Sequence, residues 1–168
     1  MLTFLFRGLT GERPAGAALF DALTAEARCP SWYVEGEVPD TLDGRFAVLA
    51  TVTALALVRL ERDGENGDHL SVAVTERFIE VMESEHRELG LGDPTLGKTV
   101  RKLVAMLARR TEQWRSADEA NWAETTRESL YKDDVASAAL DHSALALKRL
   151  AKRLSATSLD ELGQGRIE

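Results

Sequence analysis

The sequence predicts an all-α protein, a single-domain bundle of about six helices around a buried central helix. Its 168 residues, 44% of them hydrophobic and 29% charged, suit one globular domain with a continuous core. Only four prolines interrupt the chain, and its many Ala, Leu, Glu and Arg residues favour helix because they lose little rotamer freedom there. Apolar residues also recur at helical spacing. We therefore expect an N-terminal segment (1–14), a helical domain (15–155) and a C-terminal turn and tail (156–168).

The first helix is predicted over residues 15–28, where alanines and leucines recur at helical spacing. Pro30 ends it, because the residue before a proline is disfavoured in the α region. Residues 31–39 are predicted to form a connector, which its Trp and Tyr anchor to the core.

The central helix is predicted over residues 41–62, with Asp40 or Thr41 as its N-cap. Its run 46–58 is apolar on nearly every side, as expected of a helix packed on several faces. That run is well short of the roughly 20 residues needed to cross a bilayer. We therefore expect a buried helix that dominates the stability of the domain.

The polar residues 63–68 include two glycines and predict a loop. An amphipathic helix follows over residues 71–89, and a second one begins after the glycines and proline at 90–94. The inward positions of these two helices are predicted to be Val74, Phe78, Val81, Met82, Leu89, Val100, Leu103, Val104, Leu107 and Trp114. The second amphipathic helix is predicted over residues 95–117. Two further helices are predicted at 118–132 and 133–154, followed by a short turn at 158–162.

The composition also restricts the class of function. A formal net charge of −7 argues against a protein that coats nucleic acid, because such binding depends on Lys and Arg neutralising phosphates. Cys29 is the only cysteine, so the chain has no intrachain disulfide and no multi-cysteine metal cage, which fits a reducing compartment. The first residues lack the positive region and the apolar length of a secretory signal. We expect a cytoplasmic protein.

Residues 92–99 match the phosphate-loop pattern G-x-x-x-x-G-K-T, with Lys98 as its lysine. A phosphate loop follows a buried strand, whereas residues 83–89 form the charged end of a predicted helix. The chain also offers no second strand ending in an acidic residue for magnesium. We interpret the match as a corner between helices, and nucleotide binding is the less favoured alternative.

The pattern of potential metal ligands and nucleophiles points away from catalysis. Glu83 and His86 form one Glu-x-x-His motif, whereas carboxylate-bridged metal bundles use two such motifs and two further glutamates. No serine or cysteine lies in a recognisable nucleophile motif. The sequence predicts no metal, no cofactor and no enzymatic activity.

Charge is segregated along the chain. Residues 63–93 are mainly acidic, whereas residues 98–115 contain six basic residues against Glu112 alone. One interpretation is two antiparallel helices whose exposed faces attract each other. The other is a docking surface, because Lys98, Lys102 and Arg109 recur at helical spacing. A second basic cluster either extends this surface or complements a helix C-terminus; it comprises Lys148, Arg149, Lys152 and Arg153.

Three groups of residues, taken in order and spacing, resemble the ubiquinol-cytochrome c chaperone family in its bacterial form. They are Val38-Pro-Asp-Thr41 with Gly44-Arg45-Phe46, Thr75-Glu-Arg-Phe78 with Met82, and Leu89-Gly-Leu-Gly-Asp93 with Gly97-Lys98. The resemblance covers roughly residues 15–132, and the first dozen residues and the tail carry none. Pro94 and Thr99 depart from the family's usual pattern, which explains the accidental phosphate-loop match at 92–99.

The resemblance implies a helical, non-catalytic assembly factor that handles newly made cytochrome b for respiratory complex III. The mitochondrial members that it resembles act near the ribosome with a small partner protein. A generic helical adaptor with an unrelated partner is the alternative. Together with the basic residues Lys98, Lys102 and Arg109, the family motifs predict a docking surface for an anionic partner, such as the ribosome, the membrane surface or acidic loops near the client. No sequence-specific nucleic-acid binding is expected. The predicted residues of the docking surface are Lys98, Arg101, Lys102, Arg109, Asp93 and Arg45.

Five aromatic residues fall outside the obvious helical faces, at Phe4, Phe6, Trp32, Tyr33 and Trp122. They either shield apolar client segments or close the core.

Overall fold

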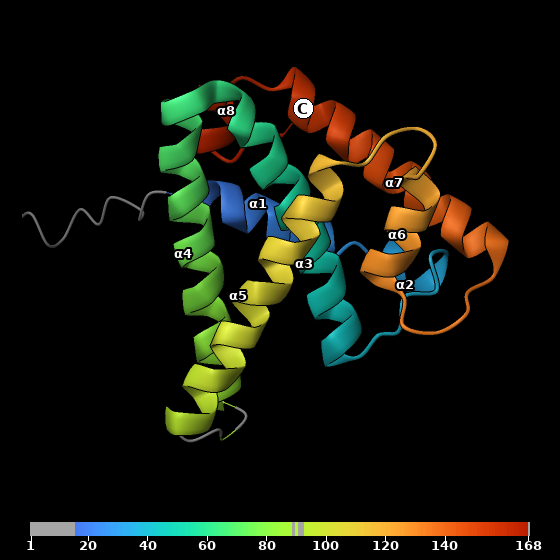
Figure 1. The fold of residues 1–168 in the computed structure, drawn as a ribbon, viewed down its shortest axis with the longest axis horizontal. Helices are drawn as coiled ribbons and strands as arrows, with labels where there is room; N and C mark the ends of the chain where they lie inside the picture. The colour runs from blue at the N-terminus through green and yellow to red at the C-terminus, as the bar shows by residue number, and fades with distance from the viewer. Residues whose placement is uncertain (1–15, 89, 91–92, 168) are drawn as a thin grey trace, which may run out of the picture.

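The computed structural model describes residues 16–88, 90 and 93–167, and all regular secondary structure in these residues is helical (Figure 1). Six helices of nine residues or more agree with the predicted bundle: α1 (Ala17–Ala27), α3 (Leu42–Leu60), α4 (Gly64–Glu88), α5 (Asp93–Arg115), α6 (Trp122–Leu130) and α7 (Ser137–Ala156). Shorter elements are α2 (Ser31–Val34), the 3₁₀-helix η1 (Glu61–Asp63) and α8 (Leu159–Gly163).

Helix α3 is the centre of the fold, as predicted. It packs against α1, α4 and α5 and, on another side, against α6 and α7 (Figure 1). Val48, Val52 and Leu60 on it are fully buried. The Thr41 hydroxyl accepts a hydrogen bond from the Gly44 N–H at 3.2 Å, so Thr41 is the N-cap. No helix in the described residues is both long and apolar enough to cross a membrane.

The core joins the predicted inward faces. Phe20 of α1 and Phe46 of α3 both pack on the Phe78 ring of α4, with centroid distances of 6.3 and 6.0 Å. On α4 and α5 the predicted inward residues are buried or half-buried: Val74, Phe78, Val81, Met82, Val100, Leu103, Val104, Leu107 and Trp114. Leu89 lies outside the described residues.

The predicted loop at 63–68 is wrong. The chain turns at Gly64, whose φ of 56° is accessible to glycine at little cost, and α4 starts at once. Before the turn, Arg59 at the end of α3 forms an ion pair with Asp63 of η1. The 3₁₀-helix η1 and the turn at Gly64 replace the loop, so α4 is longer than predicted.

Other boundaries also differ from the prediction, and α7 begins at Ser137 rather than at residue 133. The connector at 31–39 contains the short helix α2. Residues 118–121 form a turn rather than a helix, because the Asp118 carboxylate accepts hydrogen bonds from the N–H groups of Ala120 and Asn121 at 2.8 and 3.1 Å. The predicted segment 1–14 lies outside the described residues.

Side-chain hydrogen bonds attach α7 to the rest of the bundle. The Trp122 indole donates to the Ala144 carbonyl at 3.0 Å, and its ring lies 4.9 Å from that of Trp114. Arg59 donates to the carbonyls of Leu154 and Thr157 at 3.0 and 2.9 Å. Trp122 therefore has a structural role in closing the core.

Candidate functional site

The structure has an open groove of about 1100 Å³. It lies between the end of α1 with α2, the first half of α3, the end of α4 and the start of α5. Its floor is apolar and is formed by Phe46, Leu49, Val81, Met82, Leu103 and Met106. Two of these are methionines, whose unbranched side chains adapt to different partners. Such a groove suits an apolar segment of another chain.

The lip of the groove carries exposed aliphatic side chains. Val34 is 69% exposed and Leu42 is 51% exposed, and both line the groove. Val72 and Leu145 are similarly exposed, but neither belongs to the lining. Aliphatic groups beside an apolar groove form a continuous surface, which is typical of interaction sites, whereas single exposed ones are common.

The lip is built by a close contact between Pro39 and Gly44. A Cβ atom on residue 44 would lie 1.9 Å from the Pro39 carbonyl oxygen, so only glycine fits this position. The contact folds the chain before α3 back onto its first turn, where Thr41 caps the helix. This explains why the Pro-Asp-Thr and Gly-Arg-Phe residues occur together in the motif.

Ion pairs hold the charged rim. Arg45 Nε lies 2.6 Å from Asp40 Oδ1, and Lys132 Nζ lies 2.5 Å from Asp43 Oδ2. The hydrogen bond from Arg45 holds the pKa of Asp40 below its usual value, and Lys132 does the same for the pKa of Asp43. The rim also includes Arg28, Glu85, His86, Glu88 and Lys102. Both signs of charge surround the apolar floor, so the groove suits an amphipathic segment rather than a uniformly charged one.

Tyr33 joins the walls formed by α1 and α2. It lines the groove and donates a hydrogen bond to the Ala27 carbonyl at 2.9 Å. Partial burial raises the pKa of its hydroxyl, so it stays a neutral donor. Trp32 is buried in the core and donates to the Glu26 carbonyl at 2.9 Å. Of the aromatics singled out in the sequence, Tyr33 reaches the groove, whereas Phe4 and Phe6 lie outside the described residues.

The structure brings two of the predicted partner-binding residues together at this groove, Arg45 and Lys102. Lys98, Arg101 and Arg109 are exposed on α5 but do not line it. Asp93 is the first residue of α5, and its side chain lies outside the described part of the chain.

The acidic residues of α4 and the basic residues of α5 do not hold the two helices together through ion pairs among the described residues. Arg115, at the end of α5, pairs instead with Glu61 of η1 at 2.6 Å. In the second basic cluster, Lys148 pairs with Glu119, and Arg153 pairs with Glu26. The stripe on α5 is therefore left facing solvent.

The phosphate-loop match has the wrong local structure for nucleotide binding. A helix, α4, precedes it through Glu88, where a phosphate loop would follow a strand. Gly97, Lys98 and Thr99 lie inside α5, so they do not form a loop around phosphates.

His86 of the Glu-x-x-His motif is bonded within its own helix, since its Nδ1 lies 2.7 Å from the Met82 carbonyl oxygen of α4. Among the described residues, no three or more His, Cys, Asp or Glu side chains gather as metal ligands.

The position of the groove was missed by reasoning from the sequence. Its walls come from five helices, α1 to α5, and helical periodicity assigns only the inward faces. Val34 and Leu42 gave a partial signal, because Val34 is an aliphatic residue in a predicted connector and Leu42 lies in the polar first turn of the predicted central helix.

The comparisons with known proteins agree with the fold and the motifs. Residues 35–168 match the family model described as Ubiquinol-cytochrome C chaperone, so the expectation that the tail carries no resemblance was wrong. No curated protein matches the chain. The structure is similar to the crystal structure of the Cbp3 homolog from Brucella abortus, with 26% sequence identity and a TM-score of 0.75 over 100% of this chain and 96% of that one. Because the family model covers most of its length, the chain belongs to the ubiquinol-cytochrome c chaperone family.

Proposed function

We propose that this chain is a non-catalytic chaperone that binds newly made cytochrome b during assembly of the ubiquinol-cytochrome c reductase complex. The observation that carries the proposal is the apolar groove with its exposed lip at Val34 and Leu42. Family membership supplies the class of protein, and the groove supplies a physical means of binding a membrane protein.

The chemistry of the groove fits a client that has not yet been inserted. An apolar segment in water is stabilised by about 25 cal/mol for each Å² of apolar surface that it buries. The groove is open on one side, so it covers one face of a helical segment and leaves the other free. Such partial cover protects the segment from aggregation and still allows its release to the membrane.

The basic stripe of α5, defined as Lys98, Arg101, Lys102 and Arg109, is proposed to dock the chaperone on an anionic partner. All four residues are exposed, and Lys102 also belongs to the rim of the groove. The proposed partner is the ribosome, the membrane surface or acidic loops near the client. A small co-chaperone is a further proposed partner, on the basis of the family resemblance. We propose that the chain acts as a peripheral protein at the cytoplasmic face of the membrane, with its groove available to the emerging client.

A photo-cross-linking experiment in cells tests the client assignment. A photoreactive amino acid is placed at Val34 or Leu42, and matched controls carry it at Val72 or Leu145, which are equally exposed but lie away from the groove. We expect ultraviolet light to link cytochrome b to positions 34 and 42 and not to positions 72 and 145. Equal cross-linking at all four positions, or a different protein at positions 34 and 42, would contradict the proposal. The second outcome would favour a helical adaptor with an unrelated partner.

A functional test uses the same four positions. Val34→Asp combined with Leu42→Asp places two charges on the lip without opening the core, because both side chains are exposed. We expect cytochrome b to accumulate poorly in cells that carry this double variant. Cells with Val72→Asp and Leu145→Asp serve as the control and should accumulate it normally.

A further inference from the structure

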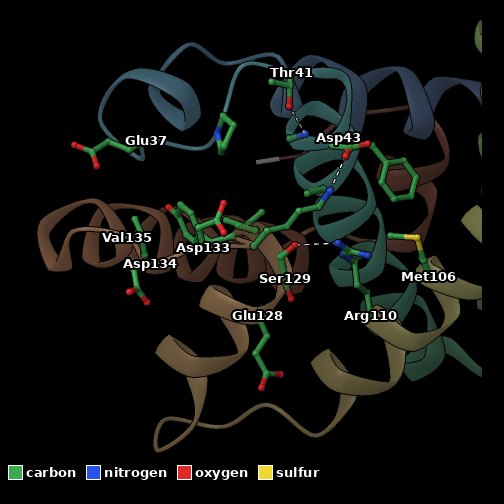
Figure 2. Close-up of a pocket in the computed structure, with 17 residues that line it drawn as sticks. Glu37, Thr41, Asp43, Met106, Arg110, Glu128, Ser129, Asp133, Asp134 and Val135 are labelled. Atoms are coloured by element: carbon green, nitrogen blue, oxygen red, sulfur yellow. Dashed lines mark hydrogen bonds and ion pairs between the residues drawn. The ribbon is translucent and has the colours of Figure 1, made fainter.

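A second cavity, of about 260 Å³, lies beside the groove (Figure 2). It is open on one side, like the groove, and is lined by residues 37–47 before and at the start of α3, by α5, by the end of α6 and by the segment 131–135. Phe46, Ala47, Met106, Leu130 and Val135 give it apolar walls. Phe46, Met106 and the paired Asp43 and Lys132 line both sites, so these four residues lie between the cavity and the groove.

The rim of this cavity is acidic. Five carboxylates line it against two cations, Arg110 and Lys132, which leaves three net negative charges. Lys132 pairs with Asp43, and Glu128 accepts a hydrogen bond from Gln113 at 3.0 Å. The other three carboxylates belong to Glu37, Asp133 and Asp134, and none of them is in an ion pair with another described residue.

Two polar groups of the cavity wall have unmet hydrogen-bonding capacity. Arg110 donates from Nη2 to the Ser129 carbonyl at 3.0 Å, as Figure 2 shows, but its Nε has no partner among the described residues. The Ser129 hydroxyl is also unpartnered, although Ser129 is only 2% exposed. Burial lowers the pKa of Arg110, and its guanidinium stands 5.8 Å over the Phe46 ring with no carboxylate partner described. Arg110 Nε and the Ser129 hydroxyl are both buried within the wall, so they do not contribute to the accessible surface of the cavity.

The backbone at the edge of the cavity is strained. Glu37 has a φ of 51° and is the one non-glycine residue with positive φ in the described part of the chain. The conformation is imposed from both sides, since Tyr131 donates to the Gly36 carbonyl at 2.6 Å and the Val38 N–H donates to the Trp32 carbonyl at 3.0 Å. Strain of this kind is typical of residues held at functional sites.

We infer that this cavity is a docking site for a cationic segment of a partner polypeptide. The apolar stem of a lysine or arginine fits the walls, and its charge is attracted by the exposed carboxylates of Glu37, Asp133 and Asp134 at the rim. Nucleic acid and anionic membranes are repelled by the same rim. The inference goes beyond the client groove and does not depend on which client that groove holds.

The test measures peptide binding to the purified full-length chain. The probe is a short fluorescent peptide of alternating lysine and leucine, followed by fluorescence anisotropy, and the comparison peptide has glutamate in place of lysine. The test variant combines Asp133→Asn with Asp134→Asn, and the matched control combines Asp68→Asn with Glu76→Gln on the exposed face of α4. We expect the test variant to bind the lysine peptide about fivefold more weakly and the control to bind it as the parent chain does. Added salt should reduce the difference.

A second pair of variants separates the cavity from the groove. Val135→Trp should fill the cavity and abolish binding of the lysine peptide, while circular dichroism checks that the helices remain. Val34→Asp with Leu42→Asp alters only the groove lip and should leave that binding intact. The inference is overturned if the double asparagine variant binds like the parent chain, if its α4 control weakens equally, or if the glutamate peptide, an oligonucleotide or anionic vesicles bind as tightly as the lysine peptide.

Discussion

The carbonyl oxygen of Pro39 occupies the place where a side chain of residue 44 would begin, 1.9 Å from the position of a Cβ atom on Gly44. This contact sets the direction in which the chain enters α3. It therefore fixes Leu42 on the groove lip and Phe46 between the groove and the acidic cavity.

Gly44→Ala should destabilise the protein, because the added methyl group would clash with the Pro39 carbonyl, and this backbone group can move only if the whole segment before α3 shifts. We expect the free energy of unfolding to fall by about 1–3 kcal/mol, the usual range for overpacking, in urea titrations followed by circular dichroism. Gly97→Ala is the matched control. An added Cβ there meets only the end of the flexible Arg101 side chain at 3.7 Å, so this change should raise stability by about 0.5–1 kcal/mol. Equal effects of the two changes would contradict the role of the Pro39 contact.

The features that were predictable from the sequence are those that depend on local periodicity. The run of apolar residues at 46–58 indicated the buried central helix, because a helix that is apolar on nearly every side must be covered by other helices on several faces. The buried positions of Phe78 and Trp114 followed from helical spacing. The sequence offered Asp40 or Thr41 as the N-cap of the central helix, and in the structure Thr41 caps it.

The features that were not predictable depend on contacts between distant segments. The groove combines Val34 with Leu103, and the cavity combines Glu37 with Asp134, pairs far apart along the chain. The predicted loop at 63–68 was wrong for a different reason. Its glycines indicated a flexible segment, whereas Gly64 alone makes the turn and the polar residues after it continue as helix.

Glu37→Gly should relieve the strain at the cavity edge. A non-glycine residue in the left-handed region costs about 1–2 kcal/mol, and glycine loses about 0.5–1 kcal/mol in backbone entropy. We therefore expect the free energy of unfolding to stay constant or to rise by up to about 1 kcal/mol, measured in urea. Glu35→Gly, two residues earlier with a φ of −83°, is the control and should lose about 0.5–1 kcal/mol. A loss at position 37 as large as at position 35 would show that Glu37 is not strained.

Glu61→Gln should change how stability depends on pH. Arg115 donates to both Glu61 oxygens, at 2.9 and 2.6 Å, and lowers the pKa of Glu61 from its ordinary 4.5. A lowered pKa in the folded state stabilises the protein above pH 4.5, and this contribution is lost as the pH falls through the folded value. Because both side chains are partly exposed, we expect a loss of about 0.5–1 kcal/mol at neutral pH.

Urea titrations at a series of pH values test this expectation. The difference between Glu61→Gln and the parent chain should shrink below pH 4.5. Glu76→Gln removes an exposed carboxylate that is in no ion pair within the described residues, and it should stay within about 0.5 kcal/mol of the parent at each pH. A difference at position 61 that is constant with pH would exclude the ion pair as its cause.

Reversing the charge of the α5 stripe should impair docking without unfolding the protein. Lys98→Glu, Lys102→Glu and Arg109→Glu act on exposed side chains, so helix packing is preserved. Each exposed charge contributes little alone, but several in line raise the encounter rate with an anionic partner in a salt-dependent way. We expect lower accumulation of cytochrome b in cells whose only copy of the chaperone carries the triple variant.

The control for this variant must carry the same total charge, because each reversal changes the net charge by two and three reversals shift it from −7 to −13. Arg87→Glu, Arg149→Glu and Lys152→Glu achieve the same shift at exposed positions outside the α5 stripe. If net charge alone mattered, both triple variants would reduce cytochrome b equally. If the stripe is an ordinary solvated face, the first variant will support normal accumulation while remaining folded. A deficit confined to the stripe, together with normal binding of the lysine peptide at the acidic cavity, would assign the two surfaces to two different partners.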